Sequence, residues 1–126
     1  MTLDEMWDLW SDTLQEALDR GHDPTPLASI LEMVKCGDAQ FWSWPTAAMV
    51  TTVRDDLLSG RRVCHIWLAG GSLEGLEQHL PEVELFARES GANDMTVCGR
   101  FGWMRSFLTK TAGFVPVAVE YHKELT

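Results

Sequence analysis

The order of elements in the last third of the chain constrains its fold more than any other feature. Residues 94–98 predict a strand, residues 100–112 a helix that ends at Gly113, and residues 114–122 a second strand. Residues typical of strands stand at alternate positions in that last segment: Val115, Val117, Val119 and Tyr121. Strand-helix-strand units of this kind imply parallel pairing through a right-handed crossover.

Two helices are expected at the start of the chain. Thr2 and Glu5 have the spacing of a capping box, and the helix after them is amphipathic and ends before Gly21. Pro26 is expected to begin a second helix. The N–H at the first helical position has no intrahelical partner, so proline, which lacks an N–H, loses no hydrogen bond there. Gly37 is expected to end that helix.

Three strands follow. Residues 39–44 and 47–54 are close enough to form an antiparallel hairpin, and residues 61–69 make a third strand. The third strand has apolar residues on both faces, which is typical of a central strand. By simple alternation one face carries Val63, His65 and Trp67, and the other carries Cys64, Ile66 and Leu68.

One more helix is expected between the third strand and residue 94. Because a single helix would connect them, residues 62–68 and 94–98 are expected to be neighbouring parallel strands. Leu73, Leu76 and Leu80 suggest a helical turn, but Pro81 would interrupt a long helix, so we expect the helix to begin near Pro81. The complete order is then α-α-β-β-β-α-β-α-β. We expect residues 1–126 to form one domain of the α/β (α+β) class, with helices on both faces of a mixed sheet.

Composition narrows the possible partners and location. The net charge is -9, and residues 1–40 contribute -7 of it, which disfavours binding to nucleic acid. The chain has no apolar run of membrane-spanning length, and its acidic N-terminus is unlike a signal peptide, so we expect a cytoplasmic protein. Three widely spaced cysteines predict neither a disulfide framework nor a metal site, and each is expected to be buried: Cys36, Cys64 and Cys98.

The stretch Gly99-Arg100-Phe101-Gly102-Trp103, the helix after it and the pair Gly113-Phe114 resemble the second half of a GNAT (Gcn5-related N-acetyltransferase) domain. The resemblance is greatest to small GNAT-like proteins encoded by bacteriophages and prophages. It implies that acetyl-CoA lies between residues 62–70 and 94–98, with the phosphates on the loop 70–75. It also implies weak chemistry, because Leu73 and Thr109 replace the glycine and the tyrosine that the family uses, and Glu74 adds negative charge.

The resemblance also nominates site residues. His65 and Tyr121 are the candidate catalytic groups, and the candidate cofactor-binding residues are Leu68, Ala69, Gly70, Gly71, Ser72, Gly75 and Arg100. Each has a structural alternative. His65 and Tyr121 would serve in packing, residues 70–75 would be a plain turn, and Arg100 would pair with Glu89 or Asp94.

Two functions remain open at this point. In the first, the protein transfers an acetyl group from acetyl-CoA to an amine, weakly or not at all. In the second, a GNAT-like scaffold without that chemistry is a binding protein, either a virion component or an inhibitor of a host protein. Its interface with a basic or apolar protein partner would be the acidic first helix and a patch of tryptophans: Trp42, Trp44 and Trp67.

Overall fold

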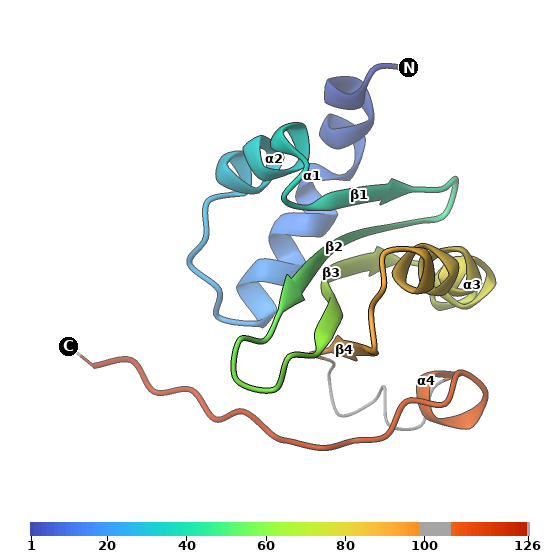
Figure 1. Cartoon of the computed structure of the whole chain (residues 1–126). Coiled ribbons are helices and arrows are strands. Elements are labelled where there is room, and N and C mark those ends of the chain that lie inside the picture. Colours follow the sequence, from blue (N-terminus) through green and yellow to red (C-terminus); the bar gives the residue numbers. More distant parts are fainter. Residues whose placement is uncertain (99–106, 126) are drawn as a thin grey trace.

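The structure is a computed structural model, and it describes residues 1–98 and 107–125 (Figure 1). Four helices and four strands are present in these residues. In chain order they are α1 (Leu3–Arg20), α2 (Leu27–Cys36), β1 (Gln40–Ser43), β2 (Ala47–Asp55), β3 (Arg62–Gly71), α3 (Leu73–Glu89), β4 (Asp94–Val97) and α4 (Phe107–Lys110).

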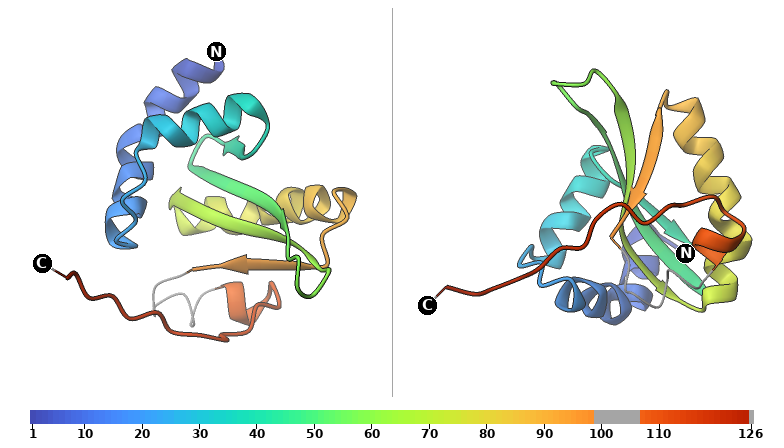
Figure 2. Two further views of the ribbon diagram at one scale, coloured as in Figure 1. Left: turned by 60° about the vertical axis from the view of Figure 1, so that its left-hand side comes forward. Right: turned by 90° about the horizontal axis from the view of Figure 1, so that it is seen from below.

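The four strands form one mixed sheet in the order β1-β2-β3-β4. The first two pairings are antiparallel, and β3 pairs with β4 in parallel. Helices α1 and α2 cover one face and α3 covers the other (Figure 2). The predicted fold class and the predicted parallel pairing of residues 62–68 with 94–98 are therefore confirmed.

The first core lies between the sheet and the helices α1 and α2. The predicted capping box forms, since Glu5 N–H donates to Thr2 Oγ1 at 3.2 Å and the Glu5 carboxylate accepts from Thr2 N–H. The apolar stripe of α1 is then buried against the sheet. The buried residues of this core are Trp7, Leu14, Leu18, Ile30, Ala39, Val50 and Leu68.

The second core lies beneath α3. The expectation that this helix begins near Pro81 was wrong. Helix α3 begins at Leu73, where the Ser72 hydroxyl accepts from Gly75 N–H, and it continues through Pro81 to Glu89. Pro81 is exposed on the outer side of the helix. A proline inside a helix costs about 3 kcal/mol, but burial of each large aliphatic side chain contributes about 1.5–3 kcal/mol. Apolar residues on both sides of the proline are buried: Leu76, Leu80, Val83 and Ala87.

The last predicted strand is the second correction. Residues 114–122 pair with no strand in the described part of the chain, and they leave α4 as an extended segment (Figure 1). Its alternating side chains are largely exposed, at 74% for Val115, 90% for Val117 and 91% for Tyr121. The helix predicted over 100–112 is described only from Phe107, and it ends at Lys110; residues 99–106 lie outside the described residues.

An irregularity in β3 changes which face its side chains occupy. Val50 pairs with Leu68 and Thr51 with Ile66, so Trp67 is an extra residue in β3. Trp67 and Leu68 consequently both pack against the α1/α2 core, while Ile66 and Ala69 pack against the α3 core. The alternation expected for Leu68 was therefore wrong. The expected burial of the cysteines holds only for Cys64, since Cys36 and Cys98 are exposed.

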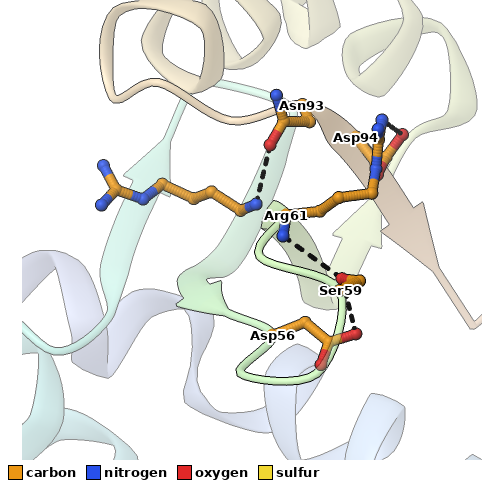
Figure 3. Close-up of polar contacts among 6 residues, drawn as sticks. Asp56, Ser59, Arg61, Asn93 and Asp94 are labelled. Atoms are coloured by element: carbon orange, nitrogen blue, oxygen red, sulfur yellow. Dashed lines mark hydrogen bonds and ion pairs between the residues drawn. The ribbon is translucent and has the colours of Figure 1, made fainter.

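Polar contacts fix the end of the sheet where β3 and β4 begin (Figure 3). The Arg61 guanidinium donates to both carboxylate oxygens of Asp94, at 2.7 and 2.8 Å. Arg62 N–H donates to Asn93 Oδ1 at 2.9 Å, and Asn93 N–H donates to Arg62 O at 2.8 Å. The two strands are thus held together at this end, and Asp94, one of the partners proposed for Arg100, is already paired.

Candidate functional site

The two parallel strands part at their other end. Val97 is the last residue of β4 and pairs with Ile66, whereas β3 continues to Gly71. Beyond Ile66, no strand pairs with the β4 side of β3 within residues 1–98 and 107–125. The backbone of Trp67 to Gly71 is therefore a free strand edge on that side, which can bind an extended ligand through its N–H and C=O groups.

A groove opens beside this free edge. Its volume is about 430 Å³, and its lining comes from α1, the end of β3 and the start of α3: Thr13, Glu16, Arg20, Ala69, Gly70, Gly71, Leu73 and Leu76. Between the sheet and α3, by contrast, a wholly apolar cavity of only about 20 Å³ remains, which is room for little more than a water molecule. Space for a ligand is therefore on the α1 side.

The glycines of the loop 70–75 are explained by close packing. A Cβ at Gly70 would overlap Thr13 Cγ2 of α1, and a Cβ at Gly75 would overlap Thr46 Oγ1. Gly71 has φ +100° and lies against the backbone of Thr46, whose carbonyl accepts from Ser72 N–H at 2.8 Å. Protein atoms thus occupy the positions that a Cβ would take at these glycines, so close packing requires glycine there whether or not a phosphate binds.

The start of α3 nevertheless offers donors to an anion. The N–H groups of Leu73 and Glu74 are the first of the helix and have no intrahelical acceptor, and Gly75 N–H is satisfied by Ser72. Arg20 adds a guanidinium to the groove, but Glu16 and Glu74 bring carboxylates to the same region. The free edge can therefore pair with an extended chain that carries amide groups, whereas an anion at the start of α3 would meet the carboxylates of Glu16 and Glu74.

His65 lies in β3 just before the point where β3 and β4 part. It pairs with Thr52 of β2 and Thr96 of β4, so these three residues form a row across the sheet on the face that carries α1 and α2. His65 Nδ1 lies 2.7 Å from Thr96 Oγ1. Burial lowers the pKa of His65, the charge of Arg54 lowers it further, and a hydrogen bond to the Thr96 backbone acts in the opposite direction. The net shift is downward, so the ring is neutral at pH 7 and able to accept a proton.

The loop between α1 and α2 is anchored to the same face. Trp67 Nε1 donates to Asp23 Oδ2 at 2.8 Å, and Thr25 donates to the other carboxylate oxygen through its backbone N–H and its hydroxyl. Burial raises the pKa of Asp23, but the hydrogen bonds from Thr25 and Trp67 outweigh it, and the net pKa is below the usual value. The charged carboxylate thus holds the loop over β3.

The remaining predicted site residues lie in different parts of the structure. Ala69, Gly70 and Gly71 line the groove, Ser72 caps α3, and Leu68 is buried in the α1/α2 core. Tyr121 is exposed on the extended segment, so its expected burial in the core was wrong, and its catalytic role stays a prediction. Arg100 lies outside the described residues.

The predicted tryptophan patch is divided between the two faces of the sheet. Trp42 and Trp44 are stacked with their ring centroids 6.1 Å apart and pack on the α3 side, while Trp67 packs on the α1/α2 side. His79 of α3 stacks on Trp44 at 4.7 Å, and Glu82 accepts from Trp44 Nε1 at 3.2 Å. These rings cover the β1 edge of the α3 core.

Three groove residues on α1 and one neighbour of His65 were among those that the sequence did not nominate. Thr13, Glu16 and Arg20 belong to α1, far from β3 in sequence, and their helical spacing gives no sign of what they face. Thr96 stands mid-strand without a motif. Among the described residues, no cluster of metal-binding side chains is present, and none of the helices there is long and apolar enough to cross a membrane.

Comparison with known proteins identifies the fold. No family model matches the sequence, and no curated protein is similar to it. Two solved structures share the fold at 14% sequence identity: an acetyltransferase from Trypanosoma brucei, with a TM-score of 0.60 over 90% of this chain and 94% of that one, and a probable acetyltransferase, with a TM-score of 0.63 over 100% of this chain and 95% of that one. The chain therefore has an acetyltransferase-like fold. The predicted resemblance to phage-encoded proteins stays a prediction, because neither description indicates such an origin.

Proposed function

We propose that the protein is an N-acyltransferase that uses acetyl-CoA, or a related thioester of CoA, and passes the acyl group to an amine. The observation that carries this proposal is the free edge of β3 from Trp67 to Gly71, which lies beside a groove of about 430 Å³. A fold shared with acetyltransferases supports it, although fold alone does not determine activity.

The chain's own residues have distinct parts in this proposal. The edge of β3 near Ala69 binds the pantetheine arm, and a backbone N–H there polarises the thioester carbonyl. Leu73 and Leu76 supply the apolar part of the groove, while Arg20 and the first N–H groups of α3 meet the phosphates. Acetyl-CoA supplies the activated acyl group.

His65 is the proposed general base. It is half-buried and lies on the α1/α2 face, one pairing step before the strands part. Because its pKa is lowered, it is unprotonated at neutral pH, and it can take a proton from the attacking amine through a chain of waters that spans the roughly 13 Å of strand between His65 and Ala69. Thr109, in the position where the resemblance places a tyrosine, is a poor proton donor, so we expect slow turnover.

Calorimetry with acetyl-CoA, CoA and S-acetylpantetheine tests the binding step. We expect binding of both acetyl thioesters, with affinities within about tenfold of each other, because the phosphates meet few donors. A ligand at 100 times its Kd stabilises the fold by about 2.7 kcal/mol, so thermal unfolding gives an independent readout. Absence of binding by all three compounds would refute the proposal.

Variants separate the groove from the rest of the surface. Arg20→Ala should weaken acetyl-CoA binding and leave S-acetylpantetheine binding unchanged, since the fragment has no diphosphate. Arg88→Ala is the matched control, because Arg88 is exposed near the other end of α3. Thiol release in the presence of primary amines then measures transfer, and His65→Gln should lower kcat by about a hundredfold without changing Kd.

A further inference from the structure

The C-terminal segment, residues 115–121, has the side-chain pattern of a strand but no neighbouring strand. Four strand-forming side chains alternate along it, and each is more than half exposed: Val115, Val117, Val119 and Tyr121. No backbone hydrogen bond joins this segment to another described residue. Its N–H and C=O groups are therefore available along both edges, and such an edge is a template for pairing with another strand.

The path of the segment keeps it from pairing with the free edge of its own sheet. At its start, Phe114 packs against the α3 core and donates its N–H to Leu108 O at 2.8 Å. Just after its end, His122 stacks on His22, which follows α1, with the ring centroids 4.4 Å apart. The segment thus crosses from the α3 side of the sheet to the α1/α2 side and does not run along β4 (Figure 2). While both ends are held in this way, a partner strand has to come from another molecule.

A second copy of the same segment is a complementary partner. Consider two antiparallel copies related by a two-fold axis at Ala118. Val117 of each copy then lies opposite Val119 of the other, and Val115 lies opposite Tyr121. Pairs of β-branched residues, and of a β-branched with an aromatic residue, stabilise antiparallel strands. Because alternate side chains share a face, all four apolar positions of each copy lie together on one face of the two-stranded ribbon.

Pro116 and Glu120 also fit this register. Opposing residues in an antiparallel pair alternate between pairs that exchange N–H···O bonds and pairs that do not. Proline has no N–H, so it belongs in a pair of the second kind. Pro116 then lies opposite Glu120, and the odd-numbered apolar residues exchange all the hydrogen bonds. Glu120 is the one charged residue of 115–121, so no like charges face each other.

We propose that residues 115–121 pair with the same residues of a second copy, forming an antiparallel ribbon that joins a symmetric dimer. The axis at Ala118 makes this an interface of one surface with itself. A two-stranded ribbon is only marginally stable, so the dimer exchanges with the monomer and its population depends on concentration. The ribbon lies outside both folded bodies, so each protomer keeps its fold without it. None of these statements depends on acyl transfer.

Sedimentation equilibrium of the full chain, from micromolar to millimolar concentration, measures this association. The wild type should rise from the mass of one chain to that of two, and a chain ending at Phe114 should stay at the mass of one. Val119→Pro should abolish the dimer, because it removes an N–H that the register directs at the second copy. Ala118→Pro is the matched control, since the N–H of the neighbouring residue points away from that strand. Both residues are exposed, so neither change should unfold the protomer.

Charges placed at the symmetry axis distinguish a second copy from any other partner. Ala118→Glu should dimerise about fivefold less tightly at low salt, because its carboxylates face each other across the axis. Mixed with Ala118→Lys, it should regain at least wild-type affinity, since a carboxylate then faces an ammonium group. The proposal fails if the wild type keeps the mass of one chain at millimolar concentration, if the two proline variants dimerise equally, or if the mixture is no tighter than Ala118→Glu alone.

Discussion

Replacing Gly71 with alanine should destabilise the protein far more than a change at another glycine of similar backbone conformation. Gly71 has φ +100°, a region in which an ordinary L-residue costs about 1–2 kcal/mol. A Cβ there would also overlap the Thr46 carbonyl oxygen and lie 2.7 Å from Ala47 Cα. Both atoms belong to backbone next to or within β2, so they cannot rotate away as a side chain would.

The overlap adds to the conformational cost. Moving the Thr46 carbonyl would break its 2.8 Å hydrogen bond from Ser72 N–H, worth about 1 kcal/mol, and forced displacement in a packed region costs about 1–3 kcal/mol. The sum for Gly71→Ala is about 3–6 kcal/mol. Gly113→Ala is the matched control, because Gly113 has φ +81° with nothing within 4 Å of its Cβ position, and it should cost only about 1–2 kcal/mol.

Urea unfolding of the two variants and the wild type measures the difference directly. The slope m should be unchanged, so that the midpoints report stability alone. Gly71→Ala should also lose binding of S-acetylpantetheine, since the groove wall would shift. Equal destabilisation by the two substitutions would refute the argument that β3 and β2 are closely packed at the start of α3.

Three further outcomes are expected. Glu74→Gln should strengthen acetyl-CoA binding by roughly fivefold, because a carboxylate at the start of α3 repels the phosphates, whereas Glu77→Gln, one turn further along, should not. Trp67→Phe should cost about 1 kcal/mol at pH 7. Because the Asp23 pKa is lowered in the folded state, the stability from its hydrogen bonds is present above pH 4 and is lost as pH falls, so this difference should vanish in acid. A chain ending at Phe114 should melt within about 4 °C of the full chain by circular dichroism, because the removed residues are mostly exposed.

Local signals explain most of the fold that could be predicted. The Thr2 and Glu5 capping box and Gly37 mark the ends of α1 and α2, because each acts through atoms a few residues away. The prediction that a helix begins near Pro81 was wrong because it considered only the free-energy cost of a proline inside a helix. The burial of apolar side chains on both sides of Pro81 offsets that cost, and this burial exists only in the folded chain.

The bulge in β3 and the extended C-terminal segment depend on contacts that are distant in sequence. Trp67 is an extra residue because its two neighbours in β3 pair with consecutive residues of β2, and no pattern of side chains in the sequence predicts this. The alternation from Val115 to Tyr121 shows that the segment is suited to a strand, but whether it pairs depends on a neighbouring edge. For the same reason α1 was not foreseen as a wall of the groove.

The loop 70–75 connects these points to function. The glycines that the resemblance placed beside the phosphates are required where α1, β2 and the start of α3 approach one another, so their presence says little about anion binding. Under the proposed function, affinity for an acyl-CoA would then come chiefly from the free edge of β3, with Arg20 as a secondary contribution. A protein that binds its ligand in this way would recognise the thioester arm more than the nucleotide. Weak binding of the phosphates is therefore compatible with the proposed acyl transfer, because the reacting thioester lies on the arm and not on the nucleotide.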